Sequence, residues 1–284
     1  MKKLLTKTVL TLSLLGSIVL TGCGGSSSSS TNVEYNNKLE KVLGKKEIVV
    51  AISPDYAPYE FIDPLKKGQD QYVGADVEFS KFIASELGVK LTIKAMDFDL
   101  ALAAPSQDQA DAVISGLTYK PGRDEFMELS DSYNVDGDGV QGLLVAKSEN
   151  GKYTSLDAFN SAEVKVGAQV GSLQETLVMD QIPNATIVPI KSLNDAIVML
   201  KEGKLNAIAI ASGSAELAIK NNTDLVYSDH TFNVADSGLL VGVKKGETEL
   251  LDEINKIIAK VVEQGLYQQW MVDAKELAEE LGEM

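Results

Sequence analysis

The sequence has very few of the side chains that bind transition metals or act as nucleophiles. Its 284 residues include one cysteine, Cys23, and one histidine, His230. A single histidine excludes a histidine-based zinc cluster and leaves a Ser-His-Asp triad without a supporting pattern. A single cysteine excludes an internal disulfide. We therefore expect no metal site, no cofactor and no catalytic residues, and we interpret His230 as a solvated loop residue.

Basic residues are also scarce, with 26 Lys and Arg against 41 Asp and Glu. Three of the lysines and none of the acids lie in residues 1–22, so the chain without them carries 23 basic and 41 acidic residues, a net charge of −18. Nucleic-acid binding depends on basic patches, so nucleic acid is not expected as a partner. The same charge disfavours direct docking onto anionic lipid.

The first 22 residues predict an export signal. Three lysines, Lys2, Lys3 and Lys7, precede an apolar stretch over residues 9–20, and small residues follow it. This stretch is too short to span a bilayer comfortably, as is typical of a secretory signal peptide.

Cys23 follows the signal directly. The sequence Leu20-Thr21-Gly22-Cys23 resembles the bacterial lipobox, in which the cysteine is diacylated and becomes the new N-terminus. Two acyl chains are enough for stable membrane anchoring. Residues 23–38, with five consecutive serines, are then a lipidated cysteine and a flexible linker. The alternative is an unrelated cysteine beside an ordinary cleavage site. We predict a lipid anchor on the extracytoplasmic face of the cell membrane.

Apolar strands alternate with amphipathic helices along the remaining chain. Residues 48–52 form a continuous apolar run that suits a buried parallel strand, and Asp76 can cap a helix that ends at Gly88. Further strands are expected at residues 91–93, 112–115, 164–168, 186–190 and 207–210. This order predicts parallel strands joined by crossover helices.

Two similar segments suggest how the chain passes between two lobes. Residues 141–145 read QGLLV and residues 237–241 read SGLLV, so they could form a paired hinge at the lobe boundaries. We predict lobe 1 from residues 39–141 plus 237–284 and lobe 2 from residues 142–236. A strand at residues 238–243 and a helix at residues 250–262 would return the chain to lobe 1.

The acidic loop over residues 134–139 has oxygen ligands at alternate positions, as calcium loops do. Val145 stands where the closing bidentate glutamate should be, so we interpret the loop as a turn.

The segment SGLTYKPGR, residues 115–123, is the first candidate for ligand binding. It lies beyond an expected strand end, which is where α/β sheets bind ligands. Arg123 offers a planar charged fork that suits a carboxylate, although a surface arginine in a polar loop is the alternative. Tyr56 and Phe98 follow two neighbouring strands and could form apolar walls. Tyr59 and Phe61 are more simply explained as core.

Several ordered motifs resemble the family of solute-binding proteins that deliver polar amino acids to ABC importers, the group containing the glutamine- and histidine-binding proteins. The motifs are residues 54–61 (PDYAPYEF), 73–77 (VGADV), 110–123 (ADAVISGLTYKPGR), 129–133 (LSDSY), 171–175 (GSLQE) and 265–267 (GLY) with Trp270. The resemblance covers nearly all of the mature chain. It implies the type II periplasmic-binding-protein fold: an α/β protein of two lobes, each a mainly parallel sheet flanked by helices, with a two-strand hinge.

The resemblance also implies roles for residues of the first lobe. Arg123 would hold the α-carboxylate of an amino acid, helped by Thr118. Gly116 would offer its carbonyl to the α-ammonium, and Tyr56 and Phe98 would enclose the side chain.

From the second lobe, Gln169, Ser172 and Leu173 would close over the carboxylate. Three positions depart from the family pattern: Ala211 stands where an acid usually pairs with the ammonium, Leu173 replaces a frequent threonine, and Ser53 replaces a frequent aspartate. These departures predict weaker binding or a different ligand specificity. Either Asp55, Asp97 or Asp99 substitutes for the missing acid, or the ligand is not an ordinary α-amino acid.

The expected partners are an amino acid or a related carboxylate as small-molecule ligand, and an ABC permease. We expect the protein to be a monomer. A ligand-dependent sensor is one alternative. An enzyme on the same fold, a dehydratase or lyase, is another, for which Glu60 and Asp97 are the available general acids or bases.

Overall fold

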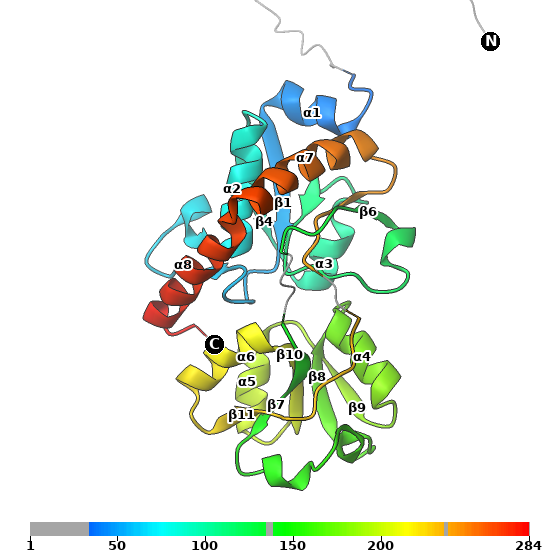
Figure 1. The fold of residues 1–284 in the computed structure, drawn as a ribbon, viewed down its shortest axis with the longest axis vertical. Coiled ribbons are helices and arrows are strands. Elements are labelled where there is room, and N and C mark those ends of the chain that lie inside the picture. The colour runs from blue at the N-terminus through cyan, green and yellow to red at the C-terminus, as the bar shows by residue number, and fades with distance from the viewer. Residues whose placement is uncertain (1–33, 135–138, 236–237, 284) are drawn as a thin grey trace, which may run out of the picture. The chain divides into compact units, whose positions relative to one another are not determined.

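Two five-stranded sheets organise the part of the chain that the computed structural model describes, residues 34–134, 139–235 and 238–283. Helices flank each sheet, so the fold is an α/β fold with two sheet-bearing lobes, as predicted (Figure 1). The signal peptide, Cys23 and most of the linker lie outside the described residues. So do residues 135–138 of the acidic loop and residue 237 of the second repeated segment. The hinge and the lobe boundaries therefore stay predictions.

The sheet of the first lobe has the order β4-β1-β5-β12-β6. Strand β1 pairs in parallel with β4 and β5, whereas β12 lies antiparallel between β5 and β6. Strand β1 lies inside the sheet, between β4 and β5. An interior strand is covered on both faces, which suits the apolar run at residues 48–52. The bounds are β1 (Glu47–Ile52), β4 (Lys90–Ala95), β5 (Ala112–Val113), β6 (Met127–Leu129) and β12 (Gly242–Lys244), with a small hairpin of β2 (Phe61–Ile62) and β3 (Tyr72–Val73).

The sheet of the second lobe has the order β11-β7-β10-β8-β9. Strands β10, β8 and β9 are parallel, and β7 is antiparallel to both of its neighbours. The bounds are β7 (Gln141–Ala146), β8 (Lys165–Gln169), β9 (Thr186–Ile190), β10 (Ala207–Ala211) and β11 (Leu225–Tyr227), with helices α4 (Leu173–Gln181), α5 (Leu193–Lys201) and α6 (Ser212–Asn221) and 3-10 turns η3 (Asn150–Lys152) and η4 (Leu156–Phe159). Each sheet is therefore mixed, with one strand opposed to the rest.

Helices of the first lobe come from both ends of the described chain (Figure 1). They are α1 (Lys38–Lys45), α2 (Ala75–Glu86), α3 (Phe98–Ala103), α7 (Thr248–Gln264) and α8 (Leu266–Leu281), with 3-10 turns η1 (Gly68–Gln71) and η2 (Arg123–Glu125). Helix α7 buries an apolar face and ends at Gly265, whose φ of 64° suits glycine. No helix among the described residues is long and apolar enough to cross a bilayer.

Helix α8 contacts both lobes. Its Tyr267 and Trp270 pack with Phe79 of α2 in the first lobe. Near its end, Glu279 pairs with Lys220 of α6 in the second lobe, and Lys275 Nζ lies 3.6 Å from the carboxylate of Glu216 on α6. The last helix thus joins the two lobes on the side of α6.

Three local predictions were wrong. Asp76 is not the cap of α2, because the helix begins at Ala75 and the Asp76 carboxylate turns inward to accept the Gly116 N–H at 2.7 Å. Strand β5 ends at Val113, since the Ser53 N–H bonds the Ser115 hydroxyl at 2.9 Å instead of a backbone carbonyl. The strand expected at residues 238–243 begins only at Gly242, after an isolated bridge at Leu239.

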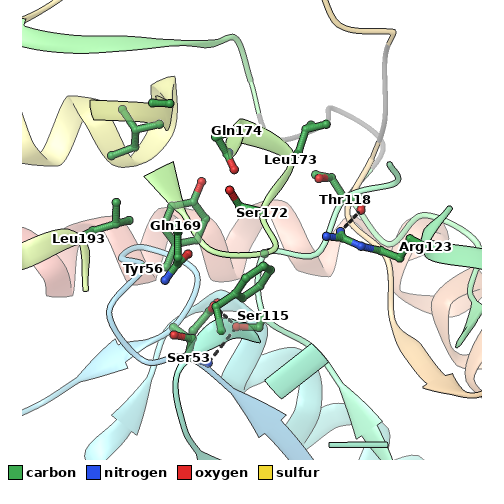
Figure 2. A pocket seen from close by; sticks show the side chains of 15 residues that line it. Ser53, Tyr56, Ser115, Thr118, Arg123, Gln169, Ser172, Leu173, Gln174 and Leu193 are labelled. Atoms are coloured by element: carbon green, nitrogen blue, oxygen red, sulfur yellow. Dashed lines mark hydrogen bonds between the residues drawn. The ribbon is translucent and has the colours of Figure 1, made fainter. Parts of the chain in front are cut away.

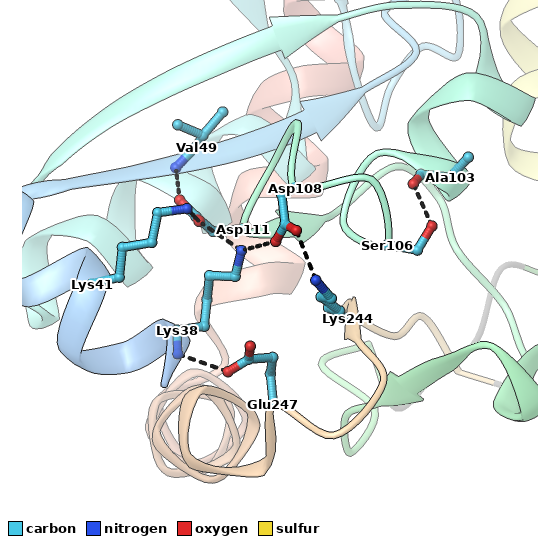
Figure 3. Close-up of polar contacts among 9 residues, drawn as sticks. All are labelled: Lys38, Lys41, Val49, Ala103, Ser106, Asp108, Asp111, Lys244 and Glu247. Carbon is cyan, nitrogen blue, oxygen red and sulfur yellow. Dashed lines mark hydrogen bonds and ion pairs between the residues drawn. The ribbon is translucent and has the colours of Figure 1, made fainter. Parts of the chain in front are cut away.

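A polar cluster fastens α1 to the first lobe (Figure 3). The Lys38 side chain is 3% exposed, and its ammonium lies 2.8 Å from Asp108 and 3.7 Å from Asp111. Asp108 also pairs with Lys244 at 2.7 Å, and the Lys38 N–H donates to Glu247 at 2.7 Å. The first helix after the linker is therefore held by groups from the loop before β5 and from the β12–α7 turn.

We expect Asp108→Asn to lower the free energy of unfolding at pH 7 by about 1 kcal/mol, a modest amount because Asp108 is half exposed and water screens its ion pairs. Hydrogen bonds from Lys244 and Lys38 lower the pKa of Asp108 to about 2. Its contribution is thus complete above its ordinary pKa and is lost as pH falls toward 2. Urea denaturation between pH 7 and pH 3 should show the two proteins converging. Asp70→Asn, at an exposed position on η1, should show no such trend.

Candidate ligand-binding site

One cavity brings together nine of the ten ligand-binding residues predicted from the sequence (Figure 2). Lining residues come from both lobes. The predicted ones are Ser53, Tyr56, Phe98, Gly116, Thr118, Arg123, Gln169, Ser172 and Leu173, and the others are Glu60, Ser115, Gln174, Leu193, Ala209 and Ile210. Ala211 is not among them. It is fully buried at the end of β10, where it pairs with Gln141 of β7.

Strand ends position these residues. Ser53 follows β1, Ser115 and Gly116 follow β5, and Gln169 ends β8, so the cavity lies beyond the carboxyl ends of parallel strands in both lobes. Gly116 has a φ of 52°, and a Cβ there would lie 2.8 Å from ring atoms of Tyr56. Only glycine therefore allows this turn to approach the Tyr56 ring.

Arg123 is a buried cation at one side of the cavity. The residue is 1% exposed, and its guanidinium donates to the carbonyl oxygens of Thr118 and, at 2.7 Å, Gly171. Its Nε has no hydrogen-bond partner among the described residues. Burial lowers the pKa of Arg123 to about 10, which still leaves it charged at neutral pH. A buried cation that bonds only neutral carbonyls suits an anionic ligand group such as a carboxylate.

Glu60 is a buried carboxyl group in the same cavity, and the sequence suggested it only as a possible catalytic acid. Its Oε1 accepts a hydrogen bond from Ser115 at 2.6 Å, and its Oε2 faces no donor among the described residues. Burial and then the negative charge of Asp76 raise the pKa of Glu60 well above its ordinary value. Glu60 is therefore the member of this carboxyl pair that holds a proton more readily.

Asp76 is the charged member. Its carboxylate accepts hydrogen bonds from Tyr267 at 2.6 Å, from Tyr133 at 3.0 Å and from the Gly116 N–H at 2.7 Å. Burial raises its pKa, but these donors oppose that shift by stabilising the ionised form. A proton on Glu60 can then be donated to Asp76, and the pair needs only one proton.

The second lobe lines the cavity with uncharged side chains. Four are apolar, Leu173, Leu193, Ala209 and Ile210, and three are polar, Gln169, Ser172 and Gln174. Ser172 lies at the start of α4, where its hydroxyl accepts the Glu175 N–H at 3.1 Å. Glu60, from the first lobe, is the one carboxyl group among the described lining residues. The acid missing from residue 211 is therefore not replaced from elsewhere in the second lobe.

Asp55 and Asp97, two of the three acids considered as substitutes, join the lobes instead. Asp55 Oδ2 accepts the N–H of Leu193, the first residue of α5, at 2.9 Å, and its other oxygen accepts the Ser53 hydroxyl at 2.8 Å. A carboxylate is favourable at a helix N-terminus. Asp97 pairs with Lys191 at 2.5 Å. Neither these two nor Asp99 lines the cavity.

Two lobes enclosing a cavity with a buried arginine and a buried carboxyl group define a solute-binding protein. The chain belongs to the bacterial extracellular solute-binding proteins, family 3, whose model matches residues 48–272.

Named relatives of this chain are binding proteins of amino-acid ABC transporters. It is 29% identical over 265 residues to the arginine-binding extracellular protein ArtP of Bacillus subtilis (strain 168), covering 90% of this chain and 94% of that protein. It is 27% identical over 232 residues to the L-cystine-binding protein TcyJ of Escherichia coli (strain K12), covering 81% and 83% of the two chains.

Solved structures of similar proteins share the fold. The amino acid ABC transporter substrate-binding protein AbpA from Streptococcus pneumoniae Canada MDR_19A, bound to L-arginine, superposes with a TM-score of 0.77 at 33% identity, over 86% of this chain and 99% of that one. AncCDT-1, an ancestral amino-acid-binding protein and precursor of cyclohexadienyl dehydratase, gives 0.73 at 26% identity, over 83% and 98%. The shared fold extends over most of this chain in both comparisons.

We expect Asp55→Ala to weaken lobe closure, because the first N–H of α5 loses a charged acceptor. Hydrogen bonds to charged groups contribute about 1.5–3 kcal/mol, so the closed population should fall by roughly 10- to 100-fold relative to the open one. Small-angle scattering of the ligand-free variant should give a larger radius of gyration. Asp97→Asn, which breaks only an exposed pair, should scatter like the wild type. Identical curves for wild type and Asp55→Ala would show that this contact does not hold the lobes together.

Proposed function

We propose that this protein captures one amino acid outside the cytoplasmic membrane, is held there by lipid on Cys23, and presents the closed, loaded form to a permease. Ligand binding draws two lobes together, and the free energy of the new contacts favours the closed form. No bond in the ligand changes. The proteins named as its relatives are binding proteins, which supports capture over catalysis.

The observation that carries the proposal is the environment of Arg123. A guanidinium that is 1% exposed, bonds only to carbonyl oxygens and keeps an unpartnered Nε among the described residues requires a negative charge. The cavity beside it is the place from which a ligand carboxylate can supply that charge. A planar carboxylate fits this fork in a way that a halide or a neutral amide does not.

The names of the relatives guide the choice of the first amino acid to test. Several relatives and structural neighbours are named for arginine, and glutamine, histidine and cystine are named as well. L-Arginine is therefore our first ligand to test. The uncharged second-lobe side of the cavity and the absence of an acid at Ala211 support a specificity that differs from that of the relatives.

Thermal unfolding in the presence of each standard amino acid tests the proposal. A ligand at 100 times its Kd should add about 2.7 kcal/mol to the free energy of unfolding. Arg123→Lys keeps the charge but loses the planar fork, so we expect it to bind the same ligand at least about tenfold more weakly. If none of the amino acids raises the melting temperature of the wild type, amino-acid capture is wrong.

Membrane attachment through Cys23 predicts a second result. In the native bacterium, the wild type should label with a fatty-acid precursor and sediment with membranes. Cys23→Ser should lose the label and appear in the soluble extracytoplasmic fraction, because the folded part carries a net negative charge that disfavours anionic lipid. A variant that still sediments with membranes would exclude Cys23 as the anchor. Ser28→Ala serves as the matched control.

A further inference from the structure

Two buried polar side chains of opposite character line the same cavity. Arg123 Nε is a donor without a hydrogen-bond partner among the described residues, and Glu60 Oε2 faces no donor there, so it carries the proton that Glu60 shares with Asp76 and becomes an acceptor once that proton is lost. Each residue is nearly or completely buried. A buried donor without a partner and a buried carboxyl group that can ionise together favour a ligand that is negative at one end and positive at the other.

We propose that Glu60 receives a positively charged nitrogen of the bound amino acid, in place of the acid that the second lobe lacks at Ala211, and that this nitrogen displaces a proton from Glu60. The inference rests on the proposed function, since it assigns a residue to the positive end of the same ligand.

The surroundings of Glu60 suit this role. Ser115 fixes Glu60 Oε1 at 2.6 Å, and the next residue, Gly116, is the one whose carbonyl is expected to meet the ammonium. The Ser53 hydroxyl gives its proton to Asp55, so the Ser53 oxygen is left as an acceptor in the cavity wall. The first lobe thus presents acceptors near Glu60, whereas the second lobe lines the cavity without a charged group.

The charges that face Glu60 explain why its carboxyl group holds a proton in the free protein. Asp76 of α2 and Asp55 after β1 both act on it with negative charge, and Ser115 after β5 is neutral. Tyr133 and Tyr267, whose pKa values are raised chiefly by burial, donate to Asp76 from beyond β6 and from α8. None of these groups is a cation. Two adjacent buried carboxylates cannot both ionise without one, so Glu60 holds the proton until a cation arrives.

The exchange of the Glu60 proton for the ligand cation needs no other reactant. The neutral carboxyl of Glu60 releases one proton to solvent, and the resulting carboxylate pairs with the nitrogen of the ligand. Because binding releases a proton, affinity should rise with pH until Glu60 ionises in the free protein.

The positive nitrogen could belong to the α-ammonium or to a cationic side chain. L-Arginine and L-citrulline separate the two, because they have nearly the same shape and only arginine has a charged side chain. If Glu60 pairs with the α-ammonium, its replacement weakens both ligands equally. If it pairs with the side chain, only arginine is affected.

The decisive variant is Glu60→Gln. Glutamine can still accept from Ser115 and can donate an amide N–H to Asp76, so it mimics the protonated carboxyl and should fold normally. Asp63→Asn is the matched control, because it removes a buried carboxylate of the same lobe that accepts the Leu65 N–H and does not line the cavity.

Titration calorimetry with L-arginine, L-citrulline and L-glutamine, in phosphate and in Tris at pH 7, gives both affinity and proton release. For the wild type and Asp63→Asn we expect about one proton released per ligand bound. For Glu60→Gln we expect none, together with roughly 10- to 100-fold weaker binding and an affinity that no longer changes between pH 6 and pH 8.

Binding by Glu60→Gln with unchanged affinity and unchanged proton release would overturn the role of Glu60 and leave amino-acid capture intact. Failure of the wild type to bind any of the three amino acids would count against capture itself, and this inference would fall with it.

Discussion

The buried carboxylate of Asp76 is the constraint on which the first lobe and its binding site depend. It is fully buried, and it accepts hydrogen bonds from the Gly116 turn, from Tyr133 before the crossing to the second lobe, and from Tyr267 on α8. A charge in that position is tolerated because three donors satisfy it. These hydrogen bonds join α2, the turn after β5 and the C-terminal helix α8 beside the cavity.

Each lobe contributes a different kind of surface to the cavity. The first provides the arginine and the carboxyl group, Arg123 and Glu60, and the second provides uncharged side chains, both aliphatic, such as Leu173, and polar, such as Gln169. Recognition of the charged ends of a ligand would therefore reside largely in one lobe. Closure then removes water from these groups, which strengthens their interactions with the ligand. Direct contacts between the lobes, such as the hydrogen bond from the Leu193 N–H to Asp55, contribute to the free energy of closure whether or not a ligand is bound.

Much of the fold and of the cavity lining could be predicted from the sequence. Buried strands appear as apolar runs, and ligand sites of α/β sheets lie beyond the strand ends. Arg123, Thr118 and Gly116 were found in this way, and the cavity contains them. Residues whose role depends on distant partners could not be found. Glu60 and Asp76 are 16 positions apart and look like ordinary surface acids, and only the fold shows that both are buried against each other. Ala211 was placed in the site by counting along a strand, but the part of β10 that lines the cavity ends one residue earlier, at Ile210.

Helix α8 contacts both lobes, so its end is a place where closure can be followed. It packs on the first lobe through Tyr267 but ends beside α6 of the second lobe, where the Asn221 side chain donates to the Glu283 carbonyl at 2.9 Å. The end of the described chain therefore contacts the second lobe at a place that a separation of the lobes would change. Fluorophores attached to the outer face of α6 and near the end of α8 would form a reporter pair that reads ligand occupancy without any label in the cavity. A bulky fusion at the C-terminus, by contrast, would itself bias the balance between open and closed forms.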